Sequence, residues 1–268
     1  MDVEYLPMQI EEHIDSIPTL ESSRMRLFRV IQDQGANLED VERIISTDPA
    51  IVAKVMKLAN SSFYRHSSGP VGLQQSLLTI GLEMVKCIAL SLAIIETFKS
   101  DAGLFKMLWR HSYAVALAGS SLVRSKQERE MLFTGGLLHD LGRMVLLCRM
   151  PQDYAPLYEL ENTWPDVGLE QEVLLTDHAR IGGILARKWH FPEEIVHIIA
   201  SHHLPKDRIS ALVCLTDLVV SRLERGFSPD VDEHAAMIFR FFPTEYKDLV
   251  NAVIQRYNTT TAIVENLG

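Results

Sequence analysis

The sequence predicts an all-α protein in which an N-terminal helical subdomain packs on a larger helical bundle. Three observations support this class. Apolar residues recur at spacings of three, four and seven along most of the chain, as they do on one face of a helix. The alternation of apolar and polar residues that is typical of strands is scarce. N-cap residues and helix-starting prolines stand just before the periodic segments.

Residues 1–100 are expected to form the N-terminal subdomain. In ANLEDVERIIS, Asn37 is a good N-cap for a helix with apolar residues at helical spacing. In TDPAIVAKVMKLANSSFY, Asp48 can cap the next helix and Pro49 fits its first turn. The segment VGLQQSLLTIGLEMVKCIALSLAIIETF predicts a short helix, a break at Gly81 and a longer buried helix.

The composition shifts near KSDAGL at residues 99–104, and eight of the ten histidines lie from His111 onward. We therefore expect a bundle over 101–225 that holds any functional site, followed by C-terminal helices over 226–268. The expected helices here are residues 104–124, 127–147, 151–162, 167–175, 177–189, 192–202 and 206–224, with two more near 230–240 and 243–257.

Composition limits the function classes. A chain of 268 residues with 47% hydrophobic residues can fill a sizeable core. Its net charge of −9, without a basic stripe, argues against nucleic acid as a partner. Cys87, Cys148 and Cys214 are far apart in apolar contexts and are expected to be buried thiols of a reducing compartment. No signal-peptide core and no apolar run of about 20 residues is present, so the sequence predicts a cytoplasmic protein that does not enter a membrane.

Polar residues interrupt several apolar helical runs. In GLLHDLGR, His139 and Asp140 are adjacent among leucines, and a buried carboxylate needs a partner or a metal. His111 shares a helix face with apolar residues, and Asp217 interrupts ALVCLTDLVVSRL with no cation at i±4. From this spacing alone, hydrogen-bonded core pairs and metal ligands both remain open.

Three more histidines join this set: His178 follows a capping Asp177, and His202 and His203 end a predicted helix. The candidate metal ligands are thus His111, His139, Asp140, His178, His202, His203 and Asp217. Mixed nitrogen and oxygen ligands suit Fe, Mn, Zn, Co or Ni, and Mg where oxygens dominate. Seven ligands exceed the need of one ion and suffice for two, so the site is mononuclear or dinuclear. A purely structural polar network is the alternative.

The order His111, His139-Asp140, Asp217 resembles the signature of the HD superfamily of metal-dependent phosphohydrolases. The wider chain is similar to the HDOD domain, the HD-related output domain of bacterial signalling proteins. The resemblance covers about residues 10–225 and includes IDSIPTL, IISTDPAIVAKVMKLANSSFY, LLTIGLEMVKCIALSLA, LWRHSYAVA, GGLLHDLGRMVL, IGGILARKWHFPEEIV and SHH.

The resemblance implies an all-helical fold with an HD-like bundle and a regulatory role in the bacterial cytoplasm, exerted on signalling proteins or through a nucleotide or phosphate ligand. It places His111, His139, Asp140 and Asp217 at the four HD positions. His178, His202 and His203 match extra ligands of the HD-GYP phosphodiesterases.

Two departures separate the chain from those enzymes. It has SHHLPKDRISA where they have a glutamate and the GYP loop, and Arg143 where they have lysine. The leading hypothesis is a signalling output module that acts by binding protein partners or a small ligand and has an HD-like site for a divalent metal. The alternative is a metal-dependent phosphohydrolase acting on a nucleotide or cyclic nucleotide, with Asp140 bridging metals and Arg143 holding the phosphate.

Overall fold

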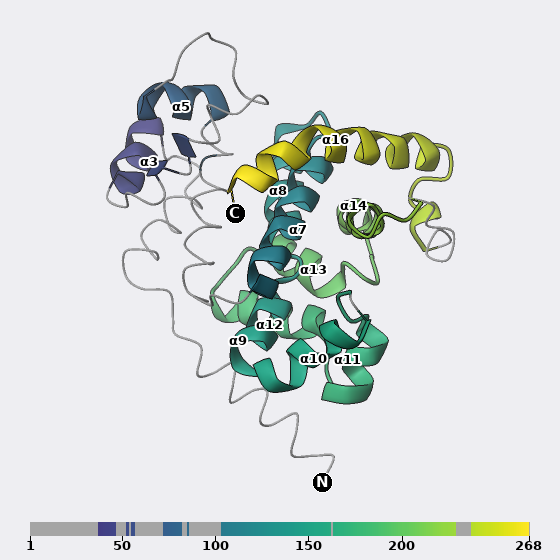
Figure 1. Cartoon of the computed structure of the whole chain (residues 1–268). Coiled ribbons are helices and arrows are strands. Elements are labelled where there is room, and N and C mark those ends of the chain that lie inside the picture. The colour runs from purple at the N-terminus through teal and green to yellow at the C-terminus, as the bar shows by residue number, and fades with distance from the viewer. Residues whose placement is uncertain are drawn as a thin grey trace. The chain divides into compact units, whose positions relative to one another are not determined.

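The computed structural model describes residues 37–46, 52–53, 55–56, 72–81, 85, 103–161, 163–228 and 237–267. These residues form helices and turns and contain no strand, which confirms the predicted all-α class (Figure 1). The chain divides into two compact units. One comprises residues 1–19 and 100–257, and the other comprises residues 20–99 and 258–268.

In the smaller unit, α3 (Leu38–Ile45) and α5 (Leu73–Ile80) pack together. Asn37 caps α3 as predicted, because its Oδ1 accepts a hydrogen bond from the backbone N–H of Asp40 at 3.0 Å. The helix α5 ends at Gly81, whose φ of 88° lies in the region that glycine adopts most readily. The break predicted at Gly81 is therefore confirmed. The helix predicted from Asp48 and Pro49 begins outside the described residues.

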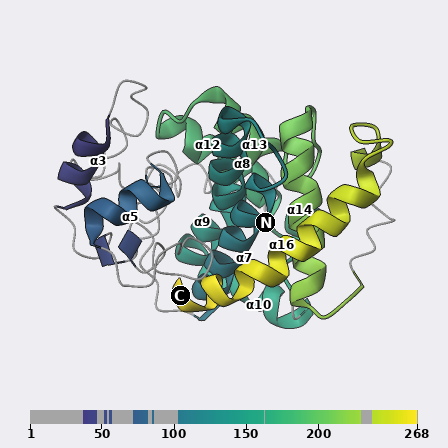
Figure 2. The same cartoon turned by 90° about the horizontal axis from the view of Figure 1, so that it is seen from above.

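The larger unit contains the remaining helices, which Figures 1 and 2 show from two directions. They are α7 (Gly103–Ser120), α8 (Lys126–Leu138), α9 (Leu141–Arg149), α10 (Pro151–Glu161), α11 (Val167–Leu174), α12 (His178–Lys188), α13 (Glu193–Ser201), α14 (Arg208–Glu224) and α16 (Tyr246–Leu267), the last of which belongs to this unit as far as Tyr257.

The core of the larger unit lies where α7, α8, α13 and α14 pack on one another, with α9 and α12 adjoining. Its side chains are aliphatic and aromatic, and include Leu108, Phe133, Leu137 and Ile199. Small residues allow close helix contacts: a side chain on Gly136 would lie 3.0 Å from the backbone of Ala116 on α7. The polar residues singled out by the sequence lie on or beside these same helices.

The prediction of a single helix over residues 127–147 is wrong. The chain instead forms α8 and α9, with a turn at His139 and Asp140. Asp140 has φ −93° and ψ 20°, in the sparsely populated bridge region where many active-site residues lie. The apolar periodicity is nearly continuous across this turn, so periodicity alone could not reveal it. The other helices between residues 103 and 224 begin and end within four residues of their predicted bounds.

The structure also bears on the expectations about membrane segments and cysteines. The stretch Lys126–Arg149 is long and apolar enough to cross a membrane, but 83% of its most apolar part is buried inside the protein, as in a core helix. Cys214 is a buried thiol as expected, whereas Cys148 is only half-buried. Cys87 and most of the helix predicted near 230–240 lie outside the described residues, and the last helix is longer than predicted and reaches Leu267.

Replacing His190 by Gly should raise the free energy of unfolding by about 0.5–1 kcal/mol. His190 follows α12 with φ 57°. Its N–H bonds to the carbonyl of Arg187, and the N–H of Phe191 bonds to that of Ala186, which is the Schellman pattern that favours glycine at this position. Urea unfolding measures the change. His190→Val should be destabilising, and equal stability of both variants would contradict the argument.

Candidate metal centre

A buried imidazole links α7 to α14. The Nε2 atom of His111 lies 3.0 Å from Oδ1 of Asp217, and its Nδ1 atom lies 2.9 Å from Oε2 of Glu224. Burial lowers the pKa of His111, but the two carboxylates, Glu224 foremost, raise it well above its usual value. Without a metal, His111 is therefore an imidazolium that donates one N–H to each carboxylate.

The turn between α8 and α9 supplies the next two side chains. The Nδ1–H of His139 donates to the carbonyl of Gly136 at 2.6 Å, so the lone pair of the neutral ring is on Nε2. This Nε2 atom is buried and has no hydrogen-bond partner among the described residues. It lies 3.4 Å from Oδ2 of Asp140 and 3.8 Å from Oδ1 of Asp217. Burial lowers the pKa of His139, but Asp140 foremost and Asp217 raise it above its usual value. A buried ring nitrogen that faces two carboxylates is the environment of a metal ligand.

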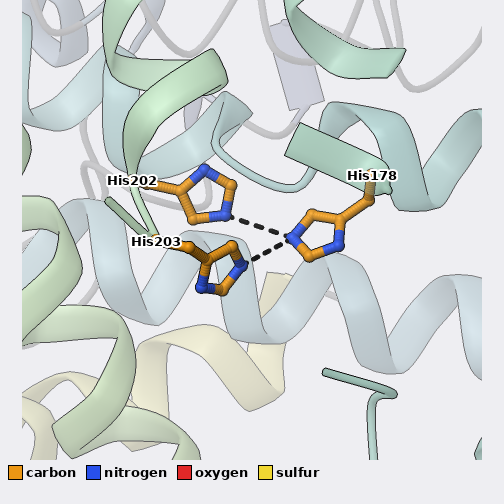
Figure 3. Close-up of side chains that lie close together, drawn as sticks. All are labelled: His178, His202 and His203. Atoms are coloured by element: carbon orange, nitrogen blue, oxygen red, sulfur yellow. Dashed lines mark hydrogen bonds between the residues drawn. The ribbon is translucent and has the colours of Figure 1, made fainter. Parts of the chain in front are cut away.

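Three histidines, one at the start of α12 and two just after α13, form a second group, which Figure 3 shows. The Nε2 atom of His178, at the start of α12, lies 3.2 Å from Nε2 of His202 and 2.8 Å from Nε2 of His203, both just after α13. Burial and the neighbouring imidazoles lower the pKa of His202 well below its usual value, and that of His203 to about 3. Both rings are therefore neutral near pH 7.

Oxygen acceptors beside the Nδ1 atoms fix the position of the ring protons of His178 and His202. The Nδ1 atom of His178 is 2.6 Å from Oε2 of Glu170, and the Nδ1 atom of His202 is 2.8 Å from the carbonyl of Ile199. Because these oxygens only accept hydrogen bonds, Nδ1 carries a proton in both rings, and the neutral form of either ring has its lone pair on Nε2. The Nε2 atoms of His178 and His202 are within hydrogen-bond distance at 3.2 Å, so a cation must lie between the two lone pairs, either a proton shared by the two rings or a metal ion.

Asp140 lies between the two groups. Its Oδ2 faces His139, while its Oδ1 lies 3.3 Å from Nε2 of His178 and 3.9 Å from Nε2 of His202. In each of two sets, the possible ligand atoms lie within 4.8 Å of one another: His178 with His202 and His203, and His111 with His139 and Asp140. One carboxylate therefore presents an oxygen to each set, as a residue that bridges two ions must.

Arg143 is buried behind Asp140. Its Nε donates to Oδ1 of Asp140 at 2.8 Å, and its Nη1 lies 2.8 Å from the hydroxyl of Tyr154, 2.9 Å from the carbonyl of Pro165 and 3.1 Å from Oε1 of Glu170. Burial would raise the pKa of Asp140, but Arg143 and then His139 hold it well below its usual value. These contacts give no support to the phosphate-holding role predicted for Arg143.

All seven predicted ligands come together in the larger unit, from α7, α12, α14 and the segments that follow α8 and α13. The sequence pattern did not single out the residues that support them, Glu170, Glu224 and Tyr154. Glu224 stands seven residues after Asp217 and so lies on the same helix face. Glu170 stands four residues before the buried Leu174, on the inner face of its helix. Helical spacing from a buried residue is thus the signal that could have found both.

Comparisons with known proteins agree with this fold. A family model described as HDOD domain matches residues 17–205. The crystal structure of an HDOD domain protein of unknown function from Geobacter sulfurreducens has a TM-score of 0.78 at 22% identity, covering 100% of this chain and 99% of that one. A protein from Shewanella amazonensis described as a candidate phosphohydrolase has a TM-score of 0.75 at 19% identity, covering 97% and 98%.

One curated relative is longer. An uncharacterized protein of Treponema pallidum (strain Nichols) is 27% identical over 203 residues, which are 74% of this chain and 40% of the relative. The chain therefore spans about 40% of the length of that relative. The family match over residues 17–205 covers more than half of the chain and includes His202 and His203, and on this basis the chain belongs to the HDOD domain family.

Proposed function

We propose that this chain is a regulatory module whose bundle holds a divalent metal centre and which acts by binding signalling proteins. One observation gives the main support for the metal site. In four imidazoles, those of His111, His139, His178 and His202, the Nδ1 atom faces an oxygen acceptor while Nε2 faces the shared interior with Asp140 and Asp217. Metal-binding histidines almost always have this arrangement, because the outer hydrogen bond fixes the tautomer that leaves Nε2 free to bind.

The donor set also limits the ion. The group of His178, His202 and His203 offers three imidazole nitrogens, which suit Zn, Fe, Ni or Co better than Mg. The group of His111 and His139 adds the carboxylates of Asp140 and Asp217, which Mn and Fe also accept. Among the predicted ions, we therefore expect the transition metals to bind and Mg to bind weakly.

A binding role fits Arg143 better than catalysis does. An enzyme that acts on phosphate esters needs cationic donors beside the metals to hold the phosphate. The guanidinium of Arg143 is buried and bonds to Asp140, Tyr154, Pro165 and Glu170 instead. Together with the missing GYP loop, this favours a module that signals through its surface and a bound ion over one that cleaves a nucleotide.

A metal-dependent phosphohydrolase remains the second candidate, because Asp140 directs its two oxygens to the two ligand groups. The similar fold described as a candidate phosphohydrolase also supports this alternative. When bound, divalent ions supply a water of lowered pKa as nucleophile. In this reading Asp140 holds the ions together, and a nucleotide phosphate is the substrate.

Metal analysis tests the proposal. Protein made without a histidine tag, stripped with chelator and titrated with Zn²⁺, Mn²⁺ or Fe²⁺, should bind one or two ions per chain. Asp140→Asn should weaken binding by about 100-fold or more, beyond the loss that follows removal of a supporting residue. His197→Asn is the matched control, because the His197 side chain is 37% exposed and pairs with Asp207 outside the site.

The outcomes separate the readings. If the wild-type protein binds no metal, the seven residues are a hydrogen-bonded polar network and both metal-based functions are wrong. If it binds metal but leaves a panel of nucleotides and cyclic dinucleotides intact, the regulatory reading stands. Metal-dependent turnover that disappears in Asp140→Asn would establish the phosphohydrolase instead.

A further inference from the structure

Glu170 is a completely buried carboxylate that touches the candidate centre only through His178. Its Oε2 accepts hydrogen bonds from the backbone N–H of His178 at 2.8 Å and from Nδ1 of the same residue at 2.6 Å. Its Oε1 accepts from the hydroxyl of Tyr154 at 2.6 Å and from Nη1 of Arg143 at 3.1 Å. Both oxygens are therefore satisfied, and the carboxylate has one fixed orientation.

We propose that Glu170 is a positioning residue of the metal centre: it keeps the proton of His178 on Nδ1 and so directs the Nε2 lone pair toward His202 and Asp140. This inference rests on the proposed metal centre and names a residue on which that centre depends. Tyr154 and Arg143 act one step further out, since they hold the carboxylate in place.

The position of His178 explains why it needs a carboxylate rather than a carbonyl. His139 and His202 donate Nδ1–H to the carbonyl three residues earlier in their own helical turns. His178 is the first residue of α12, so no preceding helical turn offers it such a carbonyl. Glu170, on α11, supplies the missing acceptor from another helix. A full negative charge also raises the basicity of the ring and strengthens it as a ligand.

Glutamine cannot replace Glu170 without a conflict. If its amide oxygen faces His178, its NH₂ group faces Nη1 of Arg143, which is itself a donor. If the amide is turned, the NH₂ group faces both the backbone N–H and the Nδ1 atom of His178. The second orientation moves the ring proton to Nε2, the atom needed for the metal. Glu170→Gln therefore tests the proton position while it nearly preserves side-chain volume.

Long-range ¹H–¹⁵N correlation spectra of the metal-free protein, taken where the imidazoles are neutral, report this proton directly. We expect His178 in the wild type to carry its proton on Nδ1, and Glu170→Gln to shift the ring toward the Nε2–H form. Glu172→Gln is the matched control, because Glu172 lies on the same helix but is exposed, and its spectrum should equal that of the wild type. An Nε2–H form of His178 in the wild type would overturn the proposal without any variant.

Metal affinity is the second readout, measured by chelator competition on variants that remain folded. Glu170→Gln should bind Zn²⁺ about 10–100-fold more weakly than the wild type, while Glu172→Gln should not differ from it. A Glu170→Gln protein with the wild-type tautomer and affinity would show that Glu170 is only structural. If the wild type binds no metal yet its tautomer shifts in Glu170→Gln, the metal function fails and the proton-holding role of Glu170 stands.

Discussion

Replacing Arg143 by Met should lower the free energy of unfolding of the metal-free protein by about 3–5 kcal/mol, the usual cost of removing one partner from a buried ion pair. Arg143 lies between Asp140 and Glu170, at 2.8 Å and 3.1 Å, and all three side chains are buried. Methionine replaces the aliphatic stem of arginine and removes the charged guanidinium. The loss therefore reports two carboxylates left without their cation.

Urea denaturation with chelator present measures this effect, because a bound metal would itself compensate Asp140. Arg187→Met is the matched control: the Arg187 side chain is 62% exposed and lies 3.8 Å from Glu193, so its replacement should change stability by less than about 0.5 kcal/mol. Arg143→Lys should fall between the two, since an ammonium keeps the charge but cannot reach every acceptor of the guanidinium at once.

This prediction also tests the two roles proposed for Arg143. A residue held ready for a phosphate would be accessible, and its loss would weaken phosphate binding with little effect on folding. The contacts of Arg143 predict the reverse, a large loss of stability. If Arg143→Met unfolds at the same urea concentration as the control, the buried network is not formed and the phosphate-holding role becomes the better explanation.

The sequence was most informative where a polar residue interrupted an apolar helical run. Asp217, His111 and the pair His139-Asp140 stand out in this way, and the structure brings them together from three parts of the bundle. The order in which these residues occur along the chain suggests that they cluster, but it does not predict which side-chain atoms are in contact. Which oxygen of Asp140 faces which histidine depends on the turn after α8, and helical periodicity does not reveal that turn.

The supporting residues were harder to predict for a physical reason. Glutamates are common on exposed helix faces, so Glu170 and Glu224 resemble ordinary surface residues in the sequence. Burial distinguishes Glu170, and it depends on how α11 packs near α12. The position of Arg143 in the sequence suggests a phosphate partner from outside the protein. In the structure its partners include Tyr154, Pro165 and Glu170.

The second large effect is expected at Gly142, where α9 lies directly against the first residue of α12. A Cβ atom on Gly142 would lie 1.9 Å from the carbonyl oxygen of His178 and 2.8 Å from its Cα. These are backbone atoms, which cannot rotate away as a side chain can. Alanine at this position therefore requires the start of α12 to move away from α9. The cost should be about 2–3 kcal/mol, in the upper part of the range for overpacked sites.

The same movement should affect the proposed metal centre, because the displaced residue, His178, is one of its proposed ligands. His178 would move away from Oδ1 of Asp140, now 3.3 Å from its Nε2, and Zn²⁺ affinity should fall about tenfold or more. Urea unfolding and chelator competition on one preparation measure both effects. In the control Gly103→Ala, where a Cβ atom meets nothing within 4 Å, neither quantity should fall. If Gly142→Ala loses stability but keeps its Zn²⁺ affinity, the movement of α12 does not displace the His178 ring. The position of this ring would then not depend on the contact between α9 and α12.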